Sequence, residues 1–331
     1  MKGTREHEGA THAAPAPSAT AQETSEGADA VGLSKLVQEH LSDFSSVLGN
    51  VLATGDADAV HDLRVVTRRL QQVLSTLSPS PRPKRVRRLR RTLRRIRRAL
   101  GAWRNYDVIL EPVARRRKAT RSPHKRAAWT LVREHLEKRR LDEMIRARRR
   151  LLDKDLSGFA DRLQTTIADL LQQTQPADVE RSVLTRVEVA WREWQAALAR
   201  AEQNGEVPTV HGLRIATKRL RYRVELARAL GDEAAEPVLE WARDVQHELG
   251  DWHDHQVLQQ LMAEALARPE VLLGAVEVVR VALAELERER RSAPAADSAI
   301  VRRTRPEDGR ELMERWPGWQ TLFSADAAET S

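Results

Sequence analysis

Apolar residues recur at helical spacing along almost the whole chain after residue 31, and no segment alternates as a half-buried β-strand would. The clearest stretch, 86–103, steps by three and four positions through Val86, Leu89, Leu93, Ile96, Leu100 and Trp103. Short breaks at proline and glycine, such as Gly101 and Gly250, separate the other helical segments. These further helices are predicted at residues 32–53, 57–77, 103–119, 125–152, 155–173, 179–203, 208–230, 234–249, 252–267 and 271–290. The chain is therefore predicted to be all-α.

One segment of the sequence occurs twice, 150 residues apart. Residues 60–70 read VHDLRVVTRRL and residues 210–220 read VHGLRIATKRL, with seven of eleven positions identical. The shift also aligns Phe44 with Trp194, and it aligns Leu100-Gly-Ala-Trp103 with Leu249-Gly-Asp-Trp252 at 149 residues. Two copies of domain size indicate a duplication into two similar lobes rather than a solenoid. We expect lobe one at about 31–175 and lobe two at about 176–322.

The ends of the chain differ in composition from the helical part. Residues 1–30 are rich in Ala, Thr, Ser, Glu and Gly and lack the apolar run of a signal peptide. We predict disordered tails at 1–30 and 323–331. No stretch approaches the roughly 18 apolar residues of a membrane span. The sequence has no cysteine, which excludes disulfides, thiolate nucleophiles and cysteine-bound metals. We expect a cytoplasmic protein without a membrane partner, of open oligomeric state.

Positive charge is concentrated in one part of the chain. The net charge is +8, but residues 82–150 hold 27 Arg and Lys against six Asp and Glu, a net +21, which leaves −13 for the rest. Between positions 87 and 98, the residues outside the apolar stripe are eight Arg and one Thr. Because such self-repulsion destabilises a compact state unless anions gather there, we expect an anionic partner.

The repeated motif, placed on a helix, separates an apolar stripe from a basic side. The stripes are Leu63, Val66 and Leu70 in the first copy and Leu213, Ala216 and Leu220 in the second. The basic sides carry His61, Arg64 and Arg68, and His211, Arg214, Lys218 and Arg221, with Arg69 and Arg219 on a flank. Guanidinium groups bind phosphate oxygens in pairs, and cations one turn apart match a repeated anion. The repeat predicts binding of a nucleic-acid backbone or a polyphosphate chain.

These motifs resemble those of the CHAD family, the conserved-histidine α-helical domain. The resemblance covers roughly residues 31–322 and also includes Leu100-Gly-x-x-Arg104-Asn-x-Asp107-Val108. It implies two four-helix bundles related by a pseudo-twofold axis, with the His/Arg/Lys helices lining a basic central channel. It also implies binding of inorganic polyphosphate and association with polyphosphate granules. The site residues that it implies are His61, Arg64, Arg68 and Arg69, and His211, Arg214, Lys218, Arg219 and Arg221.

The first copy departs from the family pattern after Leu70, where Gln71 and Gln72 replace a further basic residue. We expect the first lobe to recruit charge from the neighbouring helix instead. The candidates are Arg91, Arg94, Arg95 and Arg98.

Two other functions remain open at this point. A stripe of arginines also suits RNA or DNA phosphates, although two Tyr and three Phe offer few stacking groups. A metal-dependent phosphohydrolase would centre on Asp251, His253 and Asp254, yet no separate His-Asp pair completes such a set. The glutamates of Glu285-x-Glu287-x-Glu289 continue a helical pattern and indicate no catalytic domain. We therefore expect non-catalytic polyphosphate binding, with neither cofactor nor metal.

Overall fold

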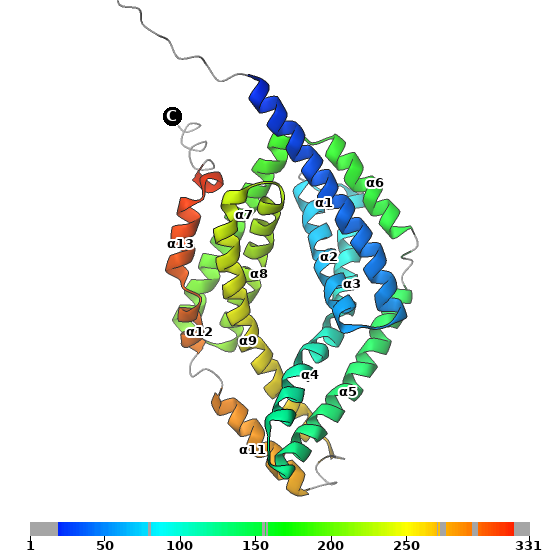
Figure 1. Cartoon of the computed structure of the whole chain (residues 1–331), viewed down its shortest axis with the longest axis vertical. Coiled ribbons are helices and arrows are strands. Elements are labelled where there is room, and N and C mark those ends of the chain that lie inside the picture. The colour runs from blue at the N-terminus through cyan, green and yellow to red at the C-terminus, as the bar shows by residue number, and fades with distance from the viewer. Residues whose placement is uncertain are drawn as a thin grey trace, which may run out of the picture.

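The computed structural model describes residues 19–320 except 79–80, 154–155, 157, 270, 272–275 and 293–296, and this part of the chain contains helices and no strand (Figure 1). The all-α prediction is confirmed. The helices are α1 (Ala19–Ala53), α2 (Ala57–Thr76), α3 (Lys84–Ala99), α4 (Gly101–Ala119), α5 (Pro123–Leu152), α6 (Phe159–Gln172), α7 (Pro176–Asn204), α8 (Val207–Ala229), the 3₁₀ turn η1 (Glu233–Ala235), α9 (Glu236–Leu266), α11 (Val276–Ser292), α12 (Asp297–Arg303) and α13 (Pro306–Arg315).

Helix α1 begins earlier than the hydrophobic pattern indicates. It starts at Ala19, inside the segment 1–30 that we expected to be a disordered tail. Residues 19–30 contain Ala, Gln and Glu, which favour a helix even where no apolar stripe marks one. Residues 1–18 and the predicted C-terminal tail lie outside the described residues. The helices α12 and α13 were not predicted.

The predicted helix break at Gly250 is wrong, because α9 runs without interruption through this residue. A glycine inside a helix costs about 1 kcal/mol relative to alanine. Leu249 and Trp252, on either side, are both buried, and burying large apolar side chains stabilises by more than that. The corresponding Gly101 does lie at a break, between α3 and α4.

Buried apolar residues form two clusters. The larger cluster joins α1, α2, α3, the start of α4, the end of α5 and α6 to α7, α8, the first part of α9, α12 and α13. The smaller cluster joins α4 and α5 to the last part of α9 and to α11, which meet at the bottom of Figure 1. Each half of the chain therefore gives two helices to the smaller cluster. The expected division into two four-helix bundles is not confirmed.

The duplicated motif occupies α2 and α8, and its apolar stripe is buried in both. Leu63 and Leu213 have no exposed surface, and Thr67 and Thr217 beside them are equally buried. The Thr217 hydroxyl accepts a hydrogen bond from Trp194 Nε1 at 3.0 Å and donates to the Leu213 carbonyl oxygen. Because these stripes fix the rotation of each helix, the opposite, basic sides of α2 and α8 have defined directions.

Ion pairs between the two halves hold the smaller cluster together. The Glu289 carboxylate accepts hydrogen bonds from Arg116 Nε at 2.6 Å and Nη2 at 2.7 Å. Glu285 pairs with Lys125 at 2.8 Å and accepts a hydrogen bond from Trp129 Nε1. Both glutamates are buried on α11, so this segment is a structural helix, as its pattern predicted. Within the described residues, no helix is long and apolar enough to cross a membrane.

Candidate functional site

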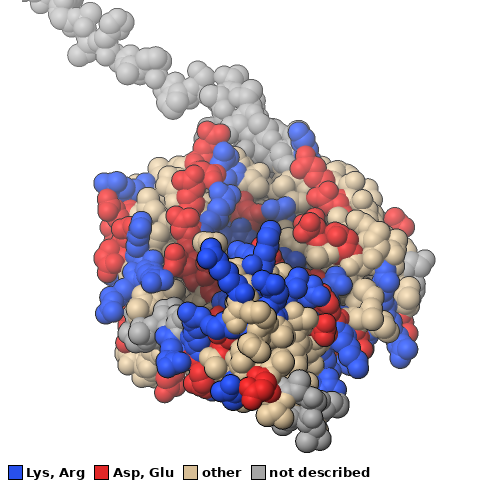
Figure 2. Space-filling view, turned by 60° about the horizontal axis from the view of Figure 1, so that its bottom comes forward, with Lys and Arg blue, Asp and Glu red and all other residues tan. Residues whose placement is uncertain are grey.

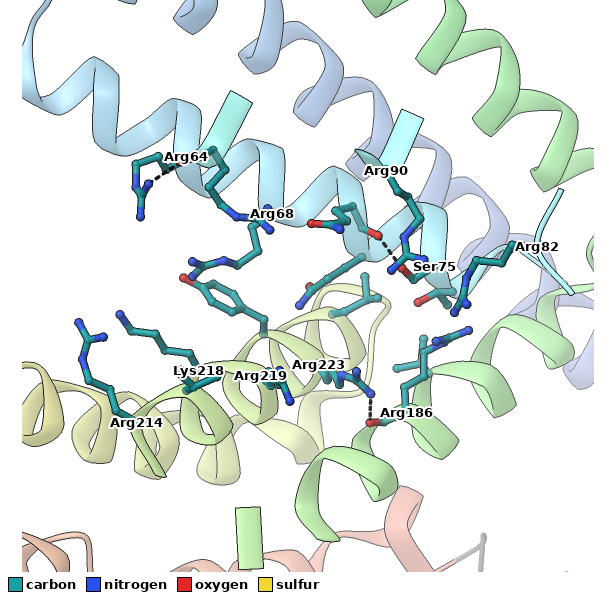
Figure 3. Close-up of a pocket in the computed structure, with 18 of the residues that line it drawn as sticks. Arg64, Arg68, Ser75, Arg82, Arg90, Arg186, Arg214, Lys218, Arg219 and Arg223 are labelled. Atoms are coloured by element: carbon teal, nitrogen blue, oxygen red, sulfur yellow. Dashed lines mark hydrogen bonds between the residues drawn. The ribbon is translucent and has the colours of Figure 1, made fainter. Parts of the chain in front are cut away.

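The basic sides of α2 and α8 face one another across a cavity of about 570 Å³. In Figure 3, arginines from α2, α3 and the segment before α3 point toward basic side chains of α7 and α8. None of the side chains that line this larger cavity is an Asp or Glu, among the described residues. Its basic lining consists of Arg64, Arg68, Arg82, Arg90, Arg97, Arg186, His211, Arg214, Lys218, Arg219 and Arg223.

A second cavity of about 210 Å³ continues the first toward α4 and α9. The two cavities share the lining residues Arg64, Arg68, Arg214, Lys218 and Tyr222. We call the two together the basic channel. The smaller cavity adds three features to the channel: the imidazoles of His61 and His253, the guanidinium of Arg104, and one carboxylate, that of Asp254.

Helix ends and neighbouring carbonyls orient several channel cations. The Asp56 side chain caps α2 by accepting hydrogen bonds from the backbone N–H groups of Asp58 and Ala59, which fixes the turn that carries His61. Arg64 Nη1 donates to the Arg97 carbonyl oxygen at 2.8 Å, near the end of α3. This contact satisfies a carbonyl of the last turn while it holds the guanidinium at the channel.

Donors without partners point to a ligand in the channel. Arg82 Nε, Arg90 Nε, Arg97 Nη1 and Arg214 Nε are buried and have no hydrogen-bond partner among the described residues. A buried unsatisfied donor is costly, and more so on a charged group. An anion with several oxygens in the channel would satisfy such donors and compensate the charge.

Burial, with repulsion between neighbouring cations, lowers the pKa values of several basic groups in the channel. Burial, followed by the charges of Arg214 and Arg68, lowers the pKa of Lys218 to about 7. Burial and the charge of Arg68 lower the pKa of Arg64 to about 10. Burial also lowers the pKa of His211, and neighbouring cations add to this effect. Without an anion, the channel therefore disfavours the protonated, charged forms of these side chains.

Of the predicted site residues, His61, Arg64, Arg68, His211, Arg214, Lys218 and Arg219 line the channel. Arg69 and Arg221 do not. Arg69 pairs with Glu225 at 2.6 Å, and Arg221 pairs with the same carboxylate at 3.4 Å. Since α2 carries Arg69 and α8 carries Arg221 and Glu225, these residues link the two helices beside the channel.

The arginines of α3 that line the channel are not those we expected. Arg91, Arg94, Arg95 and Arg98 are exposed and absent from the lining of either cavity. The channel lies instead on one flank of α3, next to the apolar stripe, where Arg90 and Arg97 stand two turns apart. Sequence reasoning also missed Arg82, Arg186 and Arg223, which no repeated motif marks.

Apart from the histidines, Tyr222 is the one aromatic residue among the described side chains that line the channel. The guanidinium carbons of Arg68 and Arg221 lie 4.4 Å and 4.1 Å from the centre of its ring. Both guanidinium groups gain a cation–π interaction with this ring. The ring is thus engaged by the protein's own arginines.

The residues of the alternative metal site do not converge. His253 and Asp254 line the smaller cavity, but Asp251 is 73% exposed and pairs with His247 at 3.5 Å. Among the described residues, no group of three or more His, Asp or Glu is placed to hold a metal ion. Burial lowers the pKa of His253 to about 4 and raises the pKa of Asp254.

The space-filling view shows lysine and arginine side chains gathered around a hollow near the centre of one face, with many of the acidic side chains to its sides (Figure 2). Positive charge on this face is therefore concentrated around the hollow.

Comparisons with known proteins agree with this architecture. The family model described as CHAD domain matches residues 35–263. The crystal structure of the CHAD domain from the plant Ricinus communis aligns with a TM-score of 0.59 at 22% sequence identity, covering 83% of this chain and 91% of that one. No curated protein matches the sequence. The structural match shows a shared fold.

Proposed function

Since the chain belongs to the CHAD domain family, we propose that its basic channel binds inorganic polyphosphate without transforming it. The observation that carries this proposal is the larger cavity, where ten Arg and Lys side chains from both halves of the chain meet without a carboxylate. A single phosphate group could engage only a few of these cations. A chain of phosphates can contact successive cations along the channel, and each contact is a charge-assisted hydrogen bond.

The extent of the channel supports a chain ligand over a compact one. The two cavities lie side by side, because they share five lining residues, and their volumes are about 570 and 210 Å³. A linear polyanion can occupy both, whereas one phosphate group would leave most of the buried cations uncompensated. We expect association with polyphosphate granules to follow from this binding.

Single-stranded nucleic acid is the weaker candidate for the channel. Proteins that bind single strands combine a basic groove with aromatic side chains on which bases stack. Apart from histidines, Tyr222 is the one aromatic residue of the described lining, and Arg68 and Arg221 already lie over its ring. Polyphosphate needs no stacking surface, so the composition of the channel suits it better.

Calorimetric titration with orthophosphate, pyrophosphate and polyphosphates of increasing length tests the proposal. We expect affinity to rise with chain length until the channel is filled, and log K to fall linearly with log salt concentration as counterions are released. Single-stranded RNA should compete weakly at physiological salt. Equal affinity for orthophosphate and long chains would refute a channel for chains.

A pair of variants separates the channel from the general charge of the surface. Arg97→Gln with Arg186→Gln removes two channel cations, while Arg162→Gln with Arg200→Gln removes two exposed arginines outside the channel lining. We expect the first pair to weaken polyphosphate binding at least tenfold. The second pair should change the affinity less than twofold, because water and salt screen the interactions of exposed charges. Equal effects of the two pairs would contradict the proposal. Chain-length analysis after incubation checks that polyphosphate stays intact.

A further inference from the structure

Helix α3 carries a second basic surface that the channel does not use. Its exposed side chains Arg87, Arg88, Arg91, Arg94, Arg95 and Arg98 form what we call the outer arginine face. At 3.6 residues per turn, this face is centred opposite the buried stripe of α3 and about 110° from the flank that holds Arg90 and Arg97. It spans about 16 Å along the helix axis. The two basic surfaces of α3 therefore point in different directions.

No acidic residue of the described part of the chain pairs with the outer arginine face. Within the described part of the chain, none of its six arginines takes part in an ion pair, although Arg85 on the same helix pairs with Asp169 of α6 at 2.6 Å. Like charges three and four positions apart destabilise a helix. Surfaces that serve solubility alone intersperse both signs of charge. An unpaired face of this kind indicates a polyanionic partner.

The shape of the face decides which polyanion fits it. It is the convex side of a helix, and a flexible single chain would contact such a side only along one line. The major groove of B-form DNA, about 12 Å across, admits an α-helix and has phosphates along both walls. Arg87 and Arg94 lie at one edge of the face, and Arg88 and Arg95 lie about 100° away at the other. Arginine side chains on these two edges can therefore reach phosphates on opposite walls of the groove.

We propose that the outer arginine face of α3 binds double-stranded DNA through its phosphate backbone, separately from the basic channel. Arg91 and Arg98 lie in the middle of the face, between the two edges. No aromatic residue occurs between Lys84 and Ala99, so the helix offers nothing on which an unpaired base could stack. Recognition is therefore expected to depend on charge and duplex shape, with little sequence preference.

The test measures binding of a labelled mixed-sequence DNA duplex of roughly 20 base pairs, about two helical turns, by fluorescence anisotropy over a range of salt concentrations. The outer-face variant carries Arg87→Gln, Arg91→Gln, Arg94→Gln and Arg98→Gln; glutamine keeps a similar helix propensity. We expect this variant to lose at least about thirtyfold in duplex affinity at 0.1 M salt, and its salt slope to fall by about three to four. Circular dichroism should show unchanged helix content.

The matched control is a channel variant, Arg64→Gln with Arg214→Gln. It should retain duplex affinity within about twofold, because both residues line the channel and neither belongs to the outer arginine face. Polyphosphate titrations of the same two variants form the other arm, in which the outer-face variant should bind normally. If the channel does not bind polyphosphate, these titrations show no binding to the channel. The duplex measurements still test the outer arginine face, because they do not depend on the channel.

Three outcomes would overturn the proposal. The first is an outer-face variant that keeps the duplex affinity and salt slope of the parent protein. The second is equal loss of duplex binding in the channel variant, which would assign both polyanions to the channel. The third concerns a parent protein that does not bind the duplex but binds two equivalents of polyphosphate. If the outer-face variant then binds only one equivalent, the face belongs to polyphosphate.

Discussion

Polyphosphate binding is predicted to take up a proton at Lys218. Burial and the neighbouring arginines lower the pKa of this lysine to about 7 in the free channel, so it is half charged at pH 7 and about one tenth charged at pH 8. A bound polyanion favours the charged amine and raises this pKa toward its ordinary value of 10.5. Binding should therefore take up about half a proton at pH 7 and about nine tenths at pH 8.

Affinity must fall as pH rises, because the bound state holds more protons than the free state. For one lysine whose pKa moves from about 7 to about 10.5, the association constant should fall about fivefold from pH 7 to 8 and about ninefold from pH 8 to 9. The same lowered pKa acts on stability without a ligand. The unfolded chain binds the proton more tightly, so between pH 10.5 and 7 this group makes the folded protein less stable as pH falls.

Calorimetry in two buffers of different ionisation enthalpy measures the proton uptake directly. The control is Lys218→Arg, which keeps the positive charge. Its guanidinium should stay protonated between pH 7 and 9, as that of Arg64 does with a pKa of about 10. The variant should therefore bind with a nearly flat pH profile in this window. Identical proton uptake at pH 8 in the parent protein and the variant would refute the role of Lys218.

Three further predictions concern stability. Thr217→Val removes the acceptor of the buried Trp194 Nε1 donor and should lower the free energy of unfolding by about 1–3 kcal/mol. Thr67→Val in the first copy should cost less, because the Thr67 hydroxyl donates to the Arg64 carbonyl oxygen of its own helix; urea unfolding compares the two variants. Arg116→Ala leaves the buried Glu289 without its bidentate partner and should lower the free energy of unfolding by about 1.5–3 kcal/mol, restored in part by Glu289→Gln. Saturating polyphosphate at a hundred times its Kd should stabilise the fold by about 2.7 kcal/mol, and an unchanged Tm would argue against a site in the native structure.

The repeated motif supplies most of the residues that the two cavities share. Its periodicity separates buried leucines from basic residues, and the structure places Arg64, Arg68, Arg214 and Lys218 around one shared space. A helical pattern gives the rotation of each helix about its own axis. It does not give the crossing of two helices, and that crossing decides which flank of α3 meets the channel. The sequence therefore indicated the arginine-rich helix but not Arg90 and Arg97.

Two other differences between the sequence-based expectations and the structure have physical causes that the hydrophobic periodicity does not reveal. Arg69 and Arg221 belong to the motif, but Glu225, a residue outside the compared segments, pairs with both and keeps them out of the channel. Gly250 is a residue type that disfavours a helix interior, yet burial of the nearby Leu249 and Trp252 keeps α9 continuous. Tertiary contacts outweigh local preference in each case.

One shared channel is the central claim, and titration of polyphosphate into two charge-reversed variants tests it most directly. One variant carries Arg64→Glu and Arg68→Glu on α2, and the other carries Arg214→Glu and Lys218→Glu on α8. All four side chains line both cavities, so each variant should weaken the binding of one chain strongly, although the opposite pair is intact. Each reversal replaces a charge-assisted hydrogen bond, typically about 1.5–3 kcal/mol, with repulsion. Two independent classes of site, one lost in each variant while the other keeps its full affinity, would contradict the shared channel.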